Sequence, residues 1–151
     1  MLDEDNVRRN MKRISKSLKI KDFSAVNSEL SAKRLAWLEQ NKELLETIEG
    51  SSVRKAFEII LFKYMKLEPS DIQVVFENDR KIVWNAFNEC PVLEACKRLN
   101  ADTRIACKEG WEKPVQEMAS FINPKLKFSR NYETLRPFGK CCNETIELAK
   151  S

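Results

Sequence analysis

The chain of 151 residues is 42% hydrophobic and 33% charged, a composition that fits a soluble globular protein and excludes a disordered chain. No apolar run approaches the roughly 18 residues of a membrane-spanning helix, so we expect no membrane span. The opening MLDEDNVRRNMKR begins with acidic residues and lacks an apolar core, so we expect no secretory signal and a cytoplasmic location. The length predicts a single domain, 1–151, with a helical half at 1–68 and a second half at 69–151 that carries the cysteines.

The net charge of +4 is unevenly distributed, because seven Lys or Arg residues and no acidic residue lie between Arg8 and Lys21. A run of this kind forms either the solvated face of a helix or a contact for nucleic acid or another anionic surface. The run lacks the interleaved aromatic residues of a single-strand binding platform, so nucleic acid is not an expected partner. The role of this segment stays open at the level of sequence.

The first predicted helix covers residues 3–20. Its apolar residues Val7, Met11, Ile14 and Leu18 stand at offsets of 0, 4, 7 and 11. These offsets place them on one stripe of a helix, so the stripe is expected to face the core.

Two further helices complete the predicted helical half. Ser24 is a candidate N-cap for a long helix that runs to about Ile48, where Gly50 provides a stop. Apolar residues on more than one side of this helix predict two neighbours, one of which would be a second subunit in a homodimer. The next helix starts near Ser52, ends before Pro69 and is apolar on nearly all sides, which predicts a place in the middle of the fold.

The second half changes to the period of β-strands. DIQVVFENDRKIVWNAFNEC predicts a β-hairpin with its turn at Asn78-Asp79, and a short helix over Val92–Leu99 follows. Residues 101–111 are ambiguous, KPVQEMASFIN predicts a helix, and the remaining residues predict a second hairpin. The order predicts an α+β fold, in which the N-terminal helices pack on one face of a four-stranded antiparallel sheet made of two hairpins with a helix between them.

Strand alternation predicts which residues of the second hairpin point inward. Leu126 and Phe128 are expected to face the helices, and Arg130 and Tyr132 continue that face. Buried polar groups cost free energy unless they find partners. These two polar residues therefore either serve the structure or line a pocket and bind a polar ligand.

The last strand has the same alternation. Ile146 is expected to point inward, and Glu144 and Cys142 share its parity, which selects Cys142 over Cys141 as the inward sulfur. A pair between Arg130 and Glu144 would satisfy both charges.

The chain contains five cysteines and no histidine. The missing histidine excludes Ser-His and Cys-His nucleophilic pairs and the common His-based zinc sites. For Cys90, Cys107 and Cys142 three interpretations stay open: metal ligation, with zinc as a candidate, thiol chemistry, or inert packing. No CxxC pair is present, and Cys96 and Cys141 are interpreted as structural.

Cys90 stands where a predicted strand meets a helix N-terminus, followed by Pro91. A helix N-terminus favours the thiolate, so the pKa of Cys90 is expected to be lowered.

The order NECP, IACKEG, INPKLKFSR and FGKCC resembles the L-2-amino-thiazoline-4-carboxylic acid hydrolase-like family, over about the C-terminal 40% of the chain. Family members often carry an acidic residue shortly after the second cysteine, where this chain has Lys108-Glu109-Gly110. The family also looks like a relative of the 4-vinyl reductase-type ligand-binding domains, in which helices pack on an antiparallel sheet. Those domains often dimerise, and some hold zinc through cysteines near the final strands. The matching positions are Cys90, Pro91, Cys107, Asn123, Pro124, Leu126, Phe128, Arg130, Gly139 and Cys142.

The resemblance implies a hydrolase that opens the ring of a small heterocyclic carboxylate. A thiolate of Cys90 or Cys107 would attack a C=N carbon, or help water to attack it. Arg130 would hold the substrate carboxylate. Glu144 would move protons, as would Tyr132, which also contacts the substrate.

The alternative is a ligand sensor or binding domain without catalytic activity. In that case Cys90, Cys107 and Cys142 would hold a structural metal, and the chain would act as a homodimer that binds a small organic ligand. Both interpretations stay open at the level of sequence.

Overall fold

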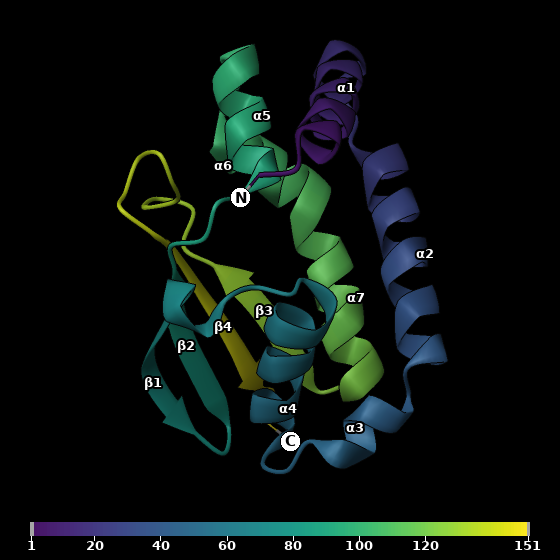
Figure 1. Cartoon of the computed structure of the whole chain (residues 1–151), viewed down its shortest axis with the longest axis vertical. Helices are drawn as coiled ribbons and strands as arrows, with labels where there is room; N and C mark the ends of the chain where they lie inside the picture. The colour runs from purple at the N-terminus through teal and green to yellow at the C-terminus, as the bar shows by residue number, and fades with distance from the viewer. Residues whose placement is uncertain (1, 151) are drawn as a thin grey trace.

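A four-stranded antiparallel sheet, with helices packed against it, forms the framework of the computed structural model, which describes residues 2–150 (Figure 1). The strand order is β1-β2-β4-β3, and every neighbouring pair is antiparallel. The predicted α+β class and the two-hairpin sheet are confirmed. The strands are β1 (Ile72–Asn78), β2 (Lys81–Ala86), β3 (Leu126–Arg130) and β4 (Cys142–Leu148).

Helices α1, α5 and α6 lie at one end of the molecule and α3 at the other, while α2 and α7 run between the two ends (Figure 1). Two of the helical segments are π-helical turns, η1 and η3, and one, η2, is a short 3₁₀ turn. Within residues 2–150, none of the helices combines the length and apolar content that crossing a bilayer requires. The helices are α1 (Glu4–Ile20), α2 (Ser24–Gln40), α3 (Glu43–Thr47), α4 (Ser52–Glu58), η1 (Ile59–Tyr64), η2 (Pro69–Asp71), α5 (Pro91–Leu99), α6 (Thr103–Ala106), η3 (Cys107–Trp111) and α7 (Glu112–Ile122).

Helix α1 follows its predicted stripe with one exception. Val7 and Ile14 are fully buried, whereas Leu18 is 40% exposed because it lies at the end of the helix. Ser24 is the first residue of α2 and not its N-cap. The side chain of Asp22 accepts the hydrogen bond from the Ser24 backbone N–H, at 2.9 Å, and so satisfies one N–H group of the first turn.

The long helix predicted to reach residue 48 is wrong beyond Gln40. The Asn41 side chain donates to the carbonyl of Trp37 at 2.8 Å, and this carbonyl lies in the last turn of α2. The side chain thus competes with the backbone N–H that would continue the helix, and the chain resumes as the separate helix α3. The apolar residues of α2 pack within the chain: Leu38 is almost fully buried, and Leu35 packs beside it on the same cluster. Contacts inside the chain therefore account for the pattern that predicted a second subunit.

The helical segment α4–η1 lies in the centre of the fold, as its apolar sequence predicted. Phe57 packs edge-on against Trp84 of β2, with ring centroids 5.1 Å apart. Phe57, Trp84, Ile82 and Ile146 belong to one large buried cluster, here called the main cluster, which joins α4 and α7 to the inner face of the sheet.

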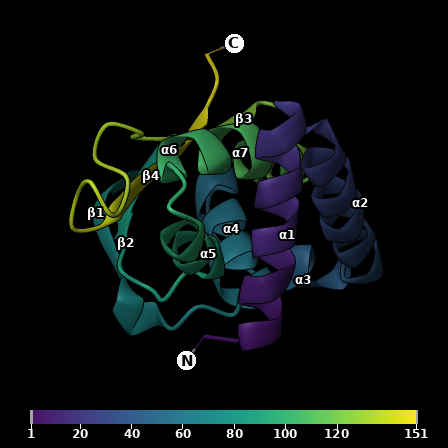
Figure 2. The ribbon, with the colours of Figure 1, turned by 90° about the horizontal axis from the view of Figure 1, so that it is seen from above.

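A second cluster of buried residues joins α1, the start of α2, α5, α6 and η3. Val7, Phe23, Ala95 and Trp111 are among its members. Figure 2 shows β1 and β2 at one side of the molecule and α1 and α2 at the opposite side. Cys107 of η3 packs on the second cluster and Cys142 of β4 on the main cluster, and the two thiols lie within electrostatic range of each other, so the two clusters approach each other there.

The hairpins differ in detail from the prediction. Asn78 pairs with Lys81, so the first turn is Asp79-Arg80, one residue later than expected. The second hairpin is joined by the long loop 131–141, which is anchored by the buried side chain of Leu135.

Strand β3 is an edge strand, and the Gln116 side chain of α7 satisfies its free edge. The Gln116 amide donates to the Leu126 carbonyl at 2.9 Å and accepts from the Phe128 N–H at 2.8 Å. One side chain thus replaces a neighbouring strand, and a covered edge does not pair with other chains.

Replacing Gln116 with Leu should lower the free energy of unfolding by about 1–3 kcal/mol, because the Leu126 and Phe128 backbone groups lose their partner. Urea unfolding measures the loss, and faster hydrogen exchange at the Phe128 amide would locate it. Gln40→Leu, at the exposed end of α2, is the matched control and should change stability by less than about 0.5 kcal/mol. Equal losses in the two variants would contradict the edge-capping role.

Candidate functional site

A buried ion pair joins the two strands of the second hairpin. Arg130 and Glu144 stand directly opposite each other on β3 and β4, and the Arg130 Nε donates to Glu144 Oε2 at 2.6 Å. Their side chains are only 12% and 14% exposed. The indole N–H of Trp84 donates to the other Glu144 oxygen at 3.1 Å. The pair that strand alternation predicted therefore exists, and it uses both oxygens of Glu144.

A second arginine, Arg34 of α2, is buried near this pair. Its Nη1 donates to the sulfur of Met118 at 3.6 Å, and its guanidinium lies 5.0 Å from the ring centroid of Tyr64. Burial lowers the pKa of Arg34. The charge of Arg130 lowers it further, while Glu144 opposes the shift. Arg34, Arg130 and Glu144 thus carry a net positive charge in a buried setting, which is costly unless an anion compensates it.

The buried side-chain polar atoms that lack a hydrogen-bond partner fall on two segments, among residues 2–150. Asn27 Oδ1, Ser31 Oγ and Arg34 Nε follow one stripe of α2, since they are four and three residues apart. Arg130 Nη1 and the Tyr132 hydroxyl lie at the end of β3. Each such atom costs about 1–3 kcal/mol and calls for an explanation, for example a ligand that the free chain lacks.

A groove of about 630 Å³ opens beside these atoms. Asn27, Arg130 and Tyr132 line it, together with charged residues of both signs: Lys108, Lys113, Lys127, Glu109 and Glu112. Burial raises the pKa of Tyr132 well above its usual range, so its hydroxyl stays protonated and is available as a donor. The Lys108 ammonium lies 5.7 Å from the centroid of the Tyr132 ring. The groove thus presents donors, and its lysines and Arg130 outnumber the carboxylates of Glu109 and Glu112.

Four cysteines lie within electrostatic range of one another, and Cys107 also lies within range of Arg130. Cys90 is the N-cap of α5, Cys96 lies within α5, Cys107 begins η3, and Cys142 begins β4. The pKa of Cys107 responds to the charges of Arg130 and of the other three thiols. The structure therefore brings Cys90, Cys107 and Cys142 together at the junction of the two clusters. Cys142 packs on the main cluster, as predicted for the inward sulfur.

The pKa expected for Cys90 is wrong in direction. Burial raises it, and this effect exceeds the lowering by the N–H groups of Val92 and Leu93 at the start of α5. Burial also raises the pKa of Cys96 to about 11 and that of Cys107 far above its usual range. These cysteines are therefore protonated thiols near neutral pH, because desolvation outweighs the helix N-terminus.

The sulfurs do not fit the metal site expected from the sequence. Among residues 2–150, no three Cys, Asp or Glu side chains are arranged to hold a metal ion. Cys142 instead accepts a hydrogen bond from the Arg136 Nε at 3.2 Å. We therefore derive no metal chemistry from Cys90, Cys107 and Cys142.

Arg136 is a site residue that the sequence did not reveal. It lies in the loop 131–141, where strand alternation gives no direction. Its Nη1 donates to the Asn88 carbonyl at 2.7 Å, and its own carbonyl accepts from the Thr103 hydroxyl at 2.7 Å. Arg136 thus fastens the loop over the cysteines, to the segment before α5 and to α6.

No protein-family model matches the chain, and neither a curated protein nor a solved structure matches it.

Replacing Glu144 with Gln should lower the free energy of unfolding by about 3–5 kcal/mol, because Arg130 then keeps a buried charge without its partner. Urea unfolding measures the loss. The control is Glu77→Gln, which breaks the pair with Arg54, whose side chains are 32% and 38% exposed. That change should cost less than about 1 kcal/mol. Similar losses in the free energy of unfolding in both variants would show that the buried pair stabilises the fold no more than the exposed pair does.

The raised pKa values of Cys90 and Cys107 predict that stability falls at alkaline pH. Above the ordinary cysteine value of 9.0 the unfolded thiols ionise while the buried thiols stay protonated. The free energy of unfolding should then fall by up to about 1.4 kcal/mol per pH unit for each thiol. Denaturant unfolding across this range measures the slope, and Cys107→Ala should flatten it. Parallel profiles for wild type and Cys107→Ala would contradict the assignment.

Proposed function

We propose that the chain binds a small organic anion in the groove between α2, α7 and β3. One observation supports this most directly: Arg130 Nη1 and the Tyr132 hydroxyl are buried, have no well-aligned hydrogen bond, and belong to residues that line the same groove. The Tyr132 hydroxyl also interacts with Arg130 and Glu112. A carboxylate accepts hydrogen bonds from both kinds of donor, and bonds between charged groups are the stronger ones.

The electrostatics of the site favour a ligand with negative charge. Glu144 compensates only one of the two buried arginines, since Arg34 has no ion pair with a carboxylate among residues 2–150. An anion in the groove would offset part of this surplus through space. A neutral ligand would satisfy the Tyr132 hydroxyl but leave the charge uncompensated.

Binding is favoured over thiolate catalysis. A nucleophilic Cys90 or Cys107 would first have to lose its proton, and burial raises both pKa values. Glu144 is a poor candidate for the base, because Arg130 and Trp84 occupy its two oxygens. A heterocyclic carboxylate, the substrate class implied by the family resemblance, remains a suitable ligand for the groove. The proposal is therefore a non-catalytic binding function for this class.

The test compares thiazole-4-carboxylate with thiazole-4-carboxamide, which differ mainly in charge. The carboxylate should raise the melting temperature and bind in titration calorimetry, and the carboxamide should do neither. Tyr132→Phe should weaken carboxylate binding by about tenfold, since it removes a hydrogen bond to a charged group. The same variant also removes the interactions of the hydroxyl with Arg130 and Glu112, so urea unfolding of the free protein measures their contribution separately.

Lys127→Gln is the matched control, because it removes an exposed positive charge at the margin of the groove. It should change the dissociation constant by less than about threefold. Equal binding of the carboxylate and the carboxamide, or an unchanged constant in Tyr132→Phe, would overturn the proposal.

A further inference from the structure

Helix α1 carries a row of exposed cations that the groove does not involve. Arg8, Lys12, Lys16 and Lys19 are spaced by four, four and three residues, so they lie on one side of the helix, and all four are exposed. These four residues are called the basic stripe below. The opposite side of α1, which includes Val7, is buried in the second cluster. The stripe extends along about 16 Å of helix, at 1.5 Å per residue.

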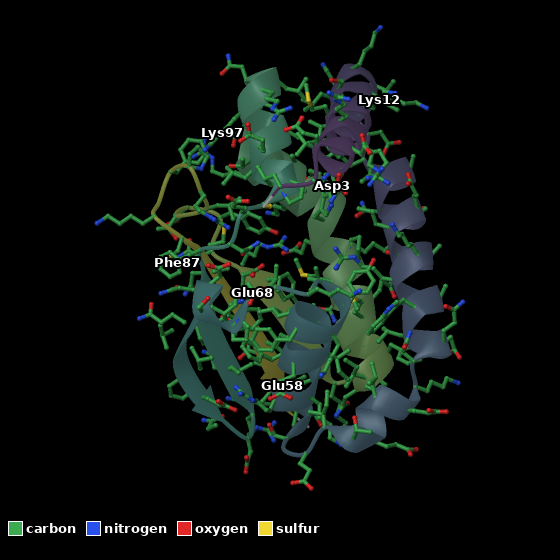
Figure 3. All side chains as sticks on the ribbon, in the orientation of Figure 1. Asp3, Lys12, Glu58, Glu68, Phe87 and Lys97 are labelled. Carbon is green, nitrogen blue, oxygen red and sulfur yellow. The ribbon has the colours of Figure 1, made fainter. Side chains whose placement is uncertain are left out.

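Glu4 lies within electrostatic range of Arg8 at one end of the basic stripe, whereas the three lysines of the stripe have no ion-pair partner among residues 2–150. The α1 cation that does have such a partner is Arg13, which binds Glu29 of α2 at the side of the stripe. Lys12 projects from the α1 end of the molecule in Figure 3. The stripe is therefore a concentrated positive surface open to a partner.

Apolar side chains stand exposed at the C-terminal end of the same helix. Leu18, Ile20 and Ile105 are 40%, 59% and 48% exposed. Leu18 and Ile105 line one depression together with Lys21, Asp22, Phe23 and Glu109, so α1 and α6 contribute to a common surface, and Ile20 stands outside it. Leu18 and Ile20 are two residues apart and so flank the stripe on different sides of α1, while the apolar face that includes Val7 is buried. Exposed aliphatic side chains next to cations can enter a bilayer interface while the cations contact the headgroups.

We propose that the basic stripe and this apolar end bind a bilayer surface that carries anionic lipid headgroups. The stripe contacts the headgroups, and Leu18, Ile20 and Ile105 enter the boundary with the acyl chains. Charge alone would also suit nucleic acid. The three exposed aliphatic side chains favour the bilayer, because a phosphate backbone offers them no apolar phase and the stripe lacks aromatic residues for stacking.

The experiment is co-sedimentation of the full chain with vesicles of phosphatidylcholine, alone or with about a third phosphatidylserine. The chain should sediment with the anionic vesicles, stay in solution with the neutral ones, and dissociate as the salt concentration rises. The triple variant Lys12→Glu, Lys16→Glu and Lys19→Glu should reduce the bound fraction at least about tenfold, since it reverses the charge of the stripe.

The matched control reverses three exposed lysines on other elements: Lys63→Glu, Lys81→Glu and Lys125→Glu. It produces the same net charge and should retain most of the binding. Ile20→Ser with Ile105→Ser keeps the charge and should weaken binding several-fold, about as expected for two lost apolar contacts. Circular dichroism checks that each variant is folded.

Several results would overturn the proposal. Wild-type chain that stays in solution with anionic vesicles at low salt would do so, and so would equal loss of binding in the two charge-reversal variants. Binding to a DNA duplex that is sensitive to the stripe but not to Ile20 and Ile105, without binding to vesicles, would assign the stripe to nucleic acid instead. A bound fraction unaffected by Ile20→Ser with Ile105→Ser would remove the apolar part of the contact and the argument for a bilayer.

Discussion

The carboxylate of Glu144 organises the end of the sheet at which the functional groups gather. It binds Arg130 of β3 through one oxygen and Trp84 of β2 through the other, so one side chain of β4 links three strands. A buried charge of this kind is tolerated only when its partners are fixed. The bond to Glu144 fixes the orientation of the Arg130 guanidinium. It therefore also fixes the position of Nη1, which makes no hydrogen bond of its own.

The position of the site follows from the way the apolar residues divide. The main cluster buries the apolar side chains of one set of elements, and the second cluster buries those of another set. The cysteines lie where these two clusters approach each other. Cys142 packs on one cluster and Cys90 and Cys107 on the other, which is how sulfurs far apart in the chain come together. Burial raises the pKa values of Cys90 and Cys107 and so keeps these thiols protonated. Burial also removes the Arg34 guanidinium from solvent, which lowers its pKa.

The sequence predicted those features that depend on local period. Alternation along β3 and β4 identified Arg130, Glu144 and the inward sulfur, because a strand reverses its side chains at every residue. It did not identify Arg34, since an arginine in an amphipathic helix normally lies at the surface. The end of α2 depends on one hydrogen bond of Asn41, and the pKa of Cys90 depends on burial. Neither leaves a periodic signal.

The two π-helical turns give this fold an unusual sensitivity to chain length. Each contains a residue more than a regular helix would need, and a single residue corresponds to about 100° of rotation. Shortening η3 by one residue would turn α7 about its axis and carry Gln116 away from β3. Insertions in the loop 131–141 would not rotate a helix in this way. Among diverging relatives, the number of residues in η3 should therefore be constrained as strongly as its buried side chain Trp111 and its closely packed Gly110.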